Sequence, residues 1–325
     1  MTTITRRTFS QLMGAAAAVS MIGVSSLAHA EVSGLELVAP SSPGSGYDQL
    51  ARAMQAVLQE DKLASGIQIQ NIAGGGGTVG LAQFITSRKR NPSALIVGFA
   101  LVGGILTTKS AVNLSTLVPL ARLMGEANVI VVPKNSDIKN MADLVTKLKA
   151  NPKAFAWGGG SIGGIDHVMV GLLAKAAGVD PTQINFVVHA GGGEVMASVL
   201  GGHVTAAVSG YEEFRGQIES GDLRAIGISS PERQPGIGVP TFKEGGVDFS
   251  MINWRGLMGP PNMPAADKKA ITEMVAAMVK SPAWKEALEK RGWLDSYQDA
   301  AQFGTFLTEE TARVETALKA GGIIK

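Results

Sequence analysis

Glycine-rich loops hold most of the residues that could contact a ligand. Four of these loops, at 43–48, 73–78, 158–167 and 190–194, each precede a stretch with helical periodicity. A helix N-terminus exposes unpaired backbone N–H groups and carries about half a positive charge, and glycine leaves that backbone accessible. None of the four loops contains Lys or Arg. We therefore expect them to hold an anion such as a carboxylate through amides, hydroxyls and water, although such loops also suit tight turns.

The four loops form two similar pairs. Asp48 and Asp166 each follow a glycine by two positions. The separation from Asp48 to Gly75 equals that from Asp166 to Gly192 within one residue. This repetition predicts two lobes of like design, each of which presents two glycine-rich helix N-termini to one cleft.

Two segments match a dinucleotide-binding motif. Segments 75–80 and 158–163 both read G-x-G-x-x-G, but a dinucleotide site also needs an acid about 20 residues later to bind the ribose. No Asp or Glu occurs in 81–125, and Asp180 precedes the strand that it would have to end. We therefore expect no nicotinamide chemistry and no cofactor.

Segment 159–163 matches the G-x-S-x-G nucleophile elbow of hydrolases. A hydrolase built on Ser161 would need a downstream acid and histidine, for which Asp180 with His189 or His203 could serve. His189 is expected to end a strand directly before a glycine loop and His203 to lie in a helix-to-strand turn, so an exported serine hydrolase stays the alternative function. The histidines after residue 30 share no helix face at i, i+4, and the chain has no Cys, so we expect no metal site.

The first thirty residues have the pattern of an export signal. Arg6 and Arg7 precede an apolar run that is too short for a membrane span, and a small-x-small sequence ends at Ala30. Cleavage after Ala30 would remove the two-charge excess of the whole chain. The paired arginines resemble a twin-arginine signal, and an uncleaved membrane anchor is the alternative. A mature chain without net charge or basic clusters is not expected to bind nucleic acid.

Short β-branched runs alternate with amphipathic stretches along the rest of the chain. The predicted strands are 35–39, 67–72, 95–99, 129–132, 155–157, 184–189 and 206–208, and the predicted helices are 50–60, 79–86, 141–150, 168–177 and 195–200. The apolar segment 94–106 contains three glycines and is interpreted as a buried strand followed by a loop. This alternation indicates α/β lobes with largely parallel sheets.

The order and spacing of several motifs resemble the substrate-binding proteins of tripartite tricarboxylate transporters, the Bug-type receptors. The motifs are PGSGYDQLAR at 43–52, the glycine run at 71–80, the segment 157–167, the glycines at 191–193, LRAI at 223–226, VPT at 239–241 and NWRG at 253–256. Segment 159–167 is most similar to the tricarboxylate-binding branch. The presence of Ser45, where many relatives have a second glycine, departs from the pattern.

The resemblance implies a two-lobe α/β periplasmic binding protein of type II, the "Venus flytrap", with two crossover strands. It divides the chain into a signal peptide at 1–30, lobe one at 31–128 and 249–325, and lobe two at 129–248. C-terminal helices at 264–319 would pack on lobe one. Carried over position by position, it also predicts a set of ligand-binding residues: Pro43, Gly44, Ser45, Tyr47, Asp48, Gly75, Gly76, Gly77, Thr78, Ser161, Gly163, Asp166, His167, Gly192, Gly193, Ser209 and Tyr211.

The function that the resemblance implies is transport without catalysis. A monomeric periplasmic receptor would capture a citrate-like di- or tricarboxylate and deliver it to an inner-membrane permease, and a ligand sensor for a signalling partner is a further alternative. Arg122 and Arg255 lie in or near the expected crossings. They could neutralise a ligand carboxylate or fix the hinge through ion pairs, and His167 could donate a hydrogen bond to the ligand.

Overall fold

Strands and helices alternate from the start of the described chain, as the sequence predicts. The computed structural model describes residues 31–87 and 91–325, and the predicted signal peptide lies outside the described residues. The strands are β1 (Val32–Ser33), β2 (Glu36–Ala39), β3 (Ala64–Ser65), β4 (Gln68–Asn71), β5 (Ser93–Gly98), β6 (Val118–Pro133), β7 (Ala156–Gly159), β8 (Asn185–Val188), β9 (Ala206–Gly210), β10 (Leu223–Ile228), β11 (Ile252–Gly259) and β12 (Leu294–Gln298).

The helices connect and cover these strands. They are α1 (Gly46–Glu60), α2 (Thr78–Thr86), α3 (Phe99–Thr108), α4 (Met141–Ala150), α5 (Ile165–Ala176), α6 (Gly192–Leu200), α7 (Tyr211–Glu219), α8 (Ala265–Met278), α9 (Pro282–Arg291) and α10 (Ala300–Ala320), with 3-10 turns η1 (Gly75–Gly77), η2 (Leu114–Thr116) and η3 (Pro181–Gln183). In 31–87 and 91–325, no helix has both the length and the apolar character that a bilayer span requires.

One long strand, β6, belongs to two half-sheets. Its first part pairs with β11 and β12, and its second part pairs with β9 and β10. The change of partner falls between Ala127, which faces Ile252, and Asn128, which faces Gly210. We call the half with strand order β4-β2-β5-β11 lobe one and the half with β9-β7-β8 lobe two. In lobe one β2 pairs in parallel with β4 and β5, and in lobe two β7 pairs in parallel with β8 and β9, as expected for α/β lobes.

The second crossing follows β10 and leads into β11. Ser229 lies there, fully buried, and accepts a hydrogen bond through its hydroxyl from the backbone N of Asn128 at 2.9 Å. The same hydroxyl donates to the carbonyl of Met251 at 2.6 Å. A single side chain therefore ties the two crossing segments together where β6 changes partner.

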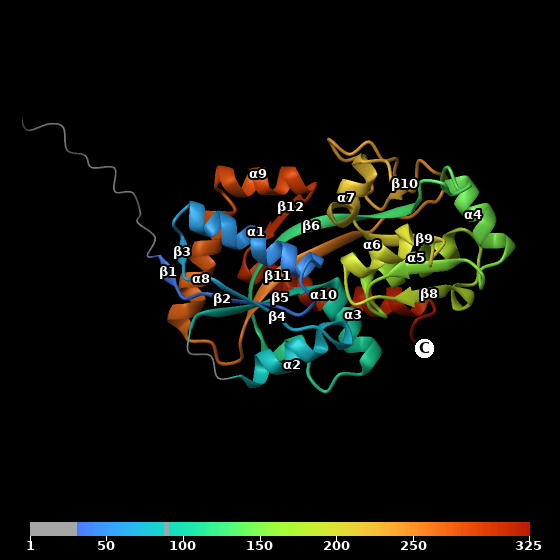
Figure 1. Cartoon of the computed structure of the whole chain (residues 1–325). Coiled ribbons are helices and arrows are strands. Elements are labelled where there is room, and N and C mark those ends of the chain that lie inside the picture. The colour runs from blue at the N-terminus through green and yellow to red at the C-terminus, as the bar shows by residue number, and fades with distance from the viewer. Residues whose placement is uncertain (1–30, 88–90) are drawn as a thin grey trace, which may run out of the picture. The chain divides into compact units, whose positions relative to one another are not determined.

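Helices of lobe one come from both ends of the sequence (Figure 1). α1 and α9 contact each other, and α8 and α10 pack on β6. α10 also contacts α5 of lobe two, where a Cβ on Gly171 would lie 2.7 Å from the carbonyl oxygen of Gly321, the residue after α10. The C-terminal helices therefore contact strands and helices of lobe one, and the last of them also touches lobe two.

The segment 94–106 corrects one prediction. It begins as strand β5, but Phe99 starts helix α3, which continues to Thr108 instead of a loop. α3 shows little amphipathic pattern, and half of its residues, Phe99 and 101–104, are buried. Its glycines therefore do not mark a loop, and their packing is described below.

Candidate functional site

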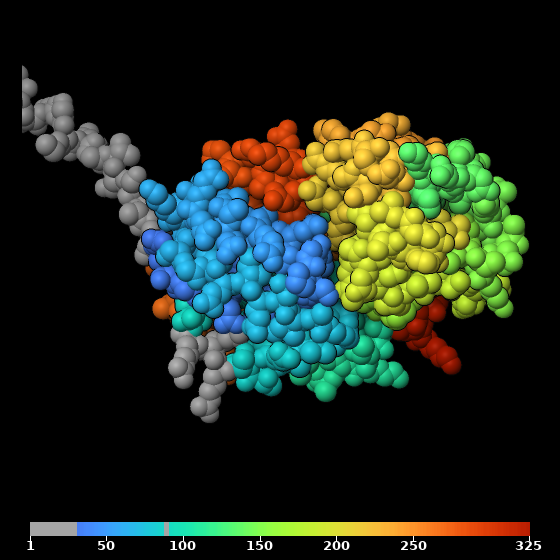
Figure 2. Space-filling model, viewed as in Figure 1, coloured from blue at the N-terminus to red at the C-terminus, as the bar shows by residue number. Residues whose placement is uncertain are grey.

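A cavity of about 560 Å³ is lined by loops of both lobes. This volume lies within the range of about 300–1,000 Å³ that is usual for small-molecule sites. Figure 2 shows the blue N-terminal segment meeting the yellow segment of lobe two, and Gly191 lies close to Ser42 and Ser45 there. The lobes are therefore in contact beside the cavity.

The structure places nine of the predicted ligand-binding residues on the cavity lining. They are Ser45, Tyr47, Gly75, Gly76, Gly77, Ser161, Asp166, Gly192 and Ser209. The other predicted residues lie in the same loops or at the start of α7 but do not line it: Pro43, Gly44, Asp48, Thr78, Gly163, His167, Gly193 and Tyr211. Residues that the prediction did not include also line the cavity, among them Ala100, Thr107, Thr108, His189, Glu213 and Asn253, together with Arg255.

Helix N-termini that meet at the cavity have no side-chain cap. This holds for α1, α3, α5 and α6, whose first turns all contribute lining residues. By contrast, side chains of Asn140, Ser281 and Asp299 cap α4, α9 and α10. α8, away from the cavity, also lacks such a cap. The N-cap residues of these helices therefore leave first-turn N–H groups available to an anion, although the N–H of Leu101 in α3 donates to the Tyr47 hydroxyl.

Asp48 organises the loop in front of α1 from outside the cavity. Its Oδ2 accepts hydrogen bonds from the backbone N of Gly44 and from Nε of Arg52, both at 2.8 Å. Burial opposes ionisation, but Arg52 and Gly44 outweigh it and lower the pKa of Asp48. The carboxylate thus fixes the loop that presents Ser45 and Gly46 to the cavity.

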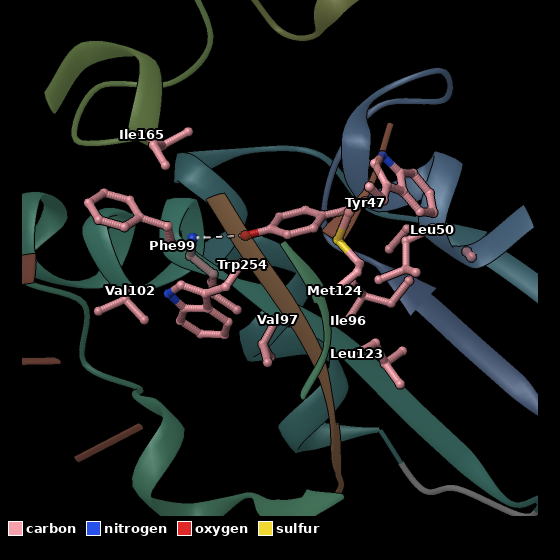
Figure 3. Close-up of a cluster of buried hydrophobic side chains, with 14 of the residues drawn as sticks. Tyr47, Leu50, Ile96, Val97, Phe99, Val102, Leu123, Met124, Ile165 and Trp254 are labelled. Carbon is pink, nitrogen blue, oxygen red and sulfur yellow. Dashed lines mark hydrogen bonds between the residues drawn. The ribbon is translucent and has the colours of Figure 1, made fainter. Parts of the chain in front are cut away.

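Tyr47 joins α1 to the start of α3. Its hydroxyl accepts a hydrogen bond from the backbone N of Leu101 at 3.0 Å, as the dashed line in Figure 3 shows. The ring lies in the lobe-one core near Met124, and burial raises the Tyr47 pKa to about 12. Tyr47 therefore stays neutral and fixes the position of one helix N-terminus relative to the other.

Asp166 is the corresponding acid in lobe two, and it faces the cavity. Its Oδ2 accepts from the backbone N of Gly160 at 2.9 Å, and its Oδ1 accepts from Nδ2 of Asn128 at 2.6 Å. Burial raises the Asp166 pKa to about 6 despite these donors. Because Asn128 is the residue where β6 changes partner, Asp166 connects the site directly to the crossing.

His167 lies next to Asp166 but behind the loop. Its Nδ1 accepts from the backbone N of Gly163 at 3.3 Å, and its ring stacks on Phe186 with centroids 4.4 Å apart. Burial lowers the His167 pKa to about 4, so the ring is neutral at physiological pH. In this arrangement His167 supports the loop and does not line the cavity.

Arg255 lines the cavity and forms a buried ion pair with Glu126. Its Nη2 is 2.8 Å from Oε2 of Glu126, although neither oxygen of Glu126 accepts a hydrogen bond of good geometry in the described chain. A Cβ on Gly46 would lie 2.0 Å from Nη2 of Arg255, and a Cβ on Gly210 would lie 2.3 Å from Oε1 of Glu126. Both glycines thus make room for these charged side chains. Arg122 does not line the cavity, and its guanidinium lies over the ring of Phe306.

Glu213, in the first turn of α7, is a site residue that the sequence reasoning missed. Its Oε2 accepts a hydrogen bond from Ser209, and a Cβ on Gly192 would lie only 2.1 Å from it. Burial, with the nearby charge of Glu126, raises the Glu213 pKa to about 7. The signal that could have found Glu213 is its place three residues after Gly210, at another strand-to-helix joint.

The lobes touch through glycines at one side of the cavity. A Cβ on Gly103 of α3 would lie 1.9 Å from the carbonyl oxygen of Gly163, and a Cβ on Gly104 would lie 2.6 Å from that of Gly76. Thr107 also reaches the carbonyl of Ile162 at 3.5 Å. Gly103 therefore allows the backbones of lobe one and lobe two to approach closely, whereas Gly104 makes room for the glycine loop of lobe one.

Other chemistries find little support in this arrangement. Within 31–87 and 91–325, Ser161 Oγ has no hydrogen bond to a histidine, which a hydrolase would use as its base. His189 instead contacts the carbonyl of Gly159. In the same part of the chain, no cluster of acidic and histidine side chains has the grouping of a metal site.

Comparisons with known proteins agree with this geometry. The family model described as "Tripartite tricarboxylate transporter family receptor" matches residues 50–323. The protein BugT of Bordetella pertussis is 27% identical over 283 residues, which cover 80% of this chain and 84% of BugT.

Two solved structures share the fold. A R. palustris protein with adipate has a TM-score of 0.81 at 21% identity, covering 89% of this chain and 97% of that one. The MatC protein from Rhodopseudomonas palustris with bound malate has a TM-score of 0.78 at 20% identity, covering 88% and 99%. The family match covers most of the chain, and the fold and the two-lobe cavity accord with it. The chain is a solute-binding receptor of the tripartite tricarboxylate transporter family.

Proposed function

We propose that this receptor is exported to the periplasm, captures a small di- or tricarboxylate of citrate-like size between its lobes, and delivers it to the permease of a tripartite tricarboxylate transporter. The observation that carries the proposal is the set of uncapped helix N-termini from both lobes around one cavity, with Arg255 on its lining. Adipate and malate in two structural neighbours support a carboxylate ligand.

The proposal includes the organisation of the chain. A signal at 1–30 would be cleaved after Ala30, lobe one would comprise 31–128 and 249–325, and lobe two would comprise 129–248. The change of partner in β6 between Ala127 and Asn128 supports this division. The mature receptor would act as a monomer and close by bending at the two crossings.

A thermal-shift screen of the chain from Glu31 onward tests the ligand class. The protein would be refolded from denaturant to remove captured ligand and screened against mono-, di- and tricarboxylates with and without Mg²⁺, amino acids, sugars and esters. A ligand at about 100 times its dissociation constant should stabilise the receptor by about 2.7 kcal/mol. We expect the shift for di- or tricarboxylates only.

Two variants serve as controls. Arg255→Gln should lose most of the shift. Arg224→Gln should keep it, because the Arg224 guanidinium does not line the cavity and donates to the carbonyls of Lys134, Ser136 and Ile138. Ester turnover that Ser161→Ala abolishes, without any carboxylate shift, would instead favour a hydrolase.

A further inference from the structure

The cavity is surrounded by more acidic than basic side chains. Arg255 is the single Lys or Arg among the described residues that line it, whereas both Asp166 and Glu213 line it. Arg255 pairs with Glu126. Asp166 and Glu213 are therefore left without a cationic side chain as partner within hydrogen-bonding distance in the described chain.

Glycines make room for two of these carboxyl groups. Oε2 of Glu213 lies against Gly192, and both oxygens of Glu126 lie against Gly210. Asp166 is held by Gly160 and Asn128. The acidic groups thus belong to regular elements around the cavity, Glu126 to β6, Asp166 to α5 and Glu213 to α7.

Glu213 differs from Asp166 in its hydrogen bonds. Both oxygens of Asp166 already accept from a donor, which favours the ionised form. Glu213 accepts only at Oε2, from Ser209, and in the described chain no hydrogen bond reaches its Oε1. Glu213 therefore has an oxygen that could carry a proton and donate it to a ligand.

Other titratable groups face Glu213 from the elements packed around it. Glu126 of β6 and Asp166 of α5 raise its pKa by repulsion, and Arg255 of β11 lowers it. His189, after β8, lines the same cavity. Burial is the largest cause of the Glu213 pKa of about 7, so a proton can be gained near neutral pH at little cost.

We propose that Glu213 binds the ligand as a neutral carboxyl group, so that a carboxylate enters the cavity together with one proton from solvent. This inference rests on the proposed function. An anion placed beside Glu213 disfavours its ionised form, whereas the neutral form donates an O–H···O⁻ hydrogen bond to the ligand. A neutral Glu213 would thereby bind the ligand carboxylate in place of repelling it.

Isothermal titration calorimetry of the refolded mature receptor tests the proton uptake. Citrate, malate and adipate would be titrated at about pH 8, where all three are ionised, in buffers of different ionisation enthalpy. We expect uptake of about one proton per ligand and an affinity that falls up to tenfold per pH unit above about pH 7. An infrared band of a protonated carboxyl group should appear on binding.

The variant Glu213→Gln tests whether Glu213 is the group that takes up the proton. The amide keeps a donor without titrating, so binding should persist at about pH 8 with proton uptake reduced by about one and with little pH dependence. Glu219→Gln, on the exposed end of the same helix, is the matched control and should keep the uptake.

Three results would overturn the inference. Carboxylate binding without proton uptake, or with uptake unchanged in Glu213→Gln, contradicts it while leaving the proposed function intact. Tightest binding of an ammonium-bearing acid without uptake would show that Glu213 acts as an anion. Absence of binding by every carboxylate would contradict the proposed function as well.

Discussion

Gly192 and Gly193 are adjacent in the first turn of α6 but have different surroundings. A Cβ on Gly192 would lie 2.1 Å from Oε2 of Glu213, whereas a Cβ on Gly193 would meet nothing within 4 Å. Gly192 therefore provides the space that Glu213 occupies beside the cavity. Gly193 has no such constraint.

This difference gives a matched pair of variants. Gly192→Ala should displace Glu213, weaken ligand binding and lower the free energy of unfolding by about 1–3 kcal/mol. Gly193→Ala should change stability by no more than about 0.5 kcal/mol. Urea unfolding and ligand titration of both variants check this, and equal effects would contradict the assigned packing.

The buried pair of Arg255 and Glu126 should show strong coupling. Arg255→Met leaves a buried carboxylate without its cation and should cost about 3–5 kcal/mol of unfolding free energy. Combining it with Glu126→Gln should recover much of that loss, because the uncompensated charge is removed. A double-mutant cycle by urea unfolding measures the coupling, and additive losses would argue against the pair.

At the residue scale, the sequence predicted the loops better than the contacts. Ser45, Ser161 and Asp166 line the cavity, because a glycine-rich helix start places neighbouring residues there. Asp48 and His167 lie in the same loops, but their side chains accept hydrogen bonds from the backbone N–H groups of Gly44 and Gly163. Which way a side chain turns depends on tertiary packing, which local sequence does not encode.

Among the elements, the crossing near Ser229 is joined by backbone hydrogen bonds to Asn128 and Met251 and by one buried hydroxyl. Ser229→Ala should leave the backbone N of Asn128 and the carbonyl of Met251 without this partner. We expect a loss of about 1–3 kcal/mol in the free energy of unfolding. The exposed Ser220→Ala is the control for urea unfolding, and a loss at Ser229 no larger than at Ser220 would argue against a structural role for the crossing hydroxyl.

The glycine contact of α3 should control closure of the lobes. A methyl group at Gly103 would collide with the carbonyl of Gly163, whereas Gly216 of α7 has nothing within 4 Å of its Cβ position. Gly103→Ala should therefore weaken carboxylate binding at least about tenfold, since the lobes could not meet as closely. Gly216→Ala should leave affinity unchanged, and calorimetry of both variants decides.

Helix α3 also shows why element prediction failed at one place. Gly103 and Gly104 are usual signals for a loop, and the surrounding residues lack amphipathic periodicity. In the fold, the first half of the helix is buried, and Gly103 and Gly104 leave room for the backbones of Gly163 and Gly76. The helices and strands with a clear period, such as α1 and β2, were predicted within a few residues.

For the whole molecule, buried carboxyl groups should make the ligand-free receptor less stable as pH rises. The pKa values of Asp166 and Glu213 are raised to about 6 and about 7. Between the ordinary carboxyl pKa and these values the folded chain binds more protons than the unfolded chain, so their stabilising effect is present at low pH and lost as pH rises through about 7. His167, with its pKa lowered to about 4, acts oppositely below about pH 6.5.

Glu213→Gln should remove part of this pH dependence. At about pH 8 the ligand-free variant should be more stable than the wild type by about 1–3 kcal/mol, and at about pH 5 the two should be similar. Urea unfolding at both pH values measures the difference. A variant that is less stable at both values would show that Glu213 stabilises the fold in its ionised form.

The place of β11 in the sheet has a consequence for how the chain reaches its native state. β11 lies between β5 and β6 in the middle of lobe one, yet it follows all of lobe two in sequence. Until residues 252–259 have been synthesised, β5 has an open edge, and contacts of long sequence separation form slowly. A chain ending at residue 250 should therefore show protected backbone amides in β7–β9 and rapid hydrogen exchange in β5. During biosynthesis, lobe two would be completed first, and lobe one would expose an unpaired strand that needs protection from aggregation until the C-terminal quarter arrives.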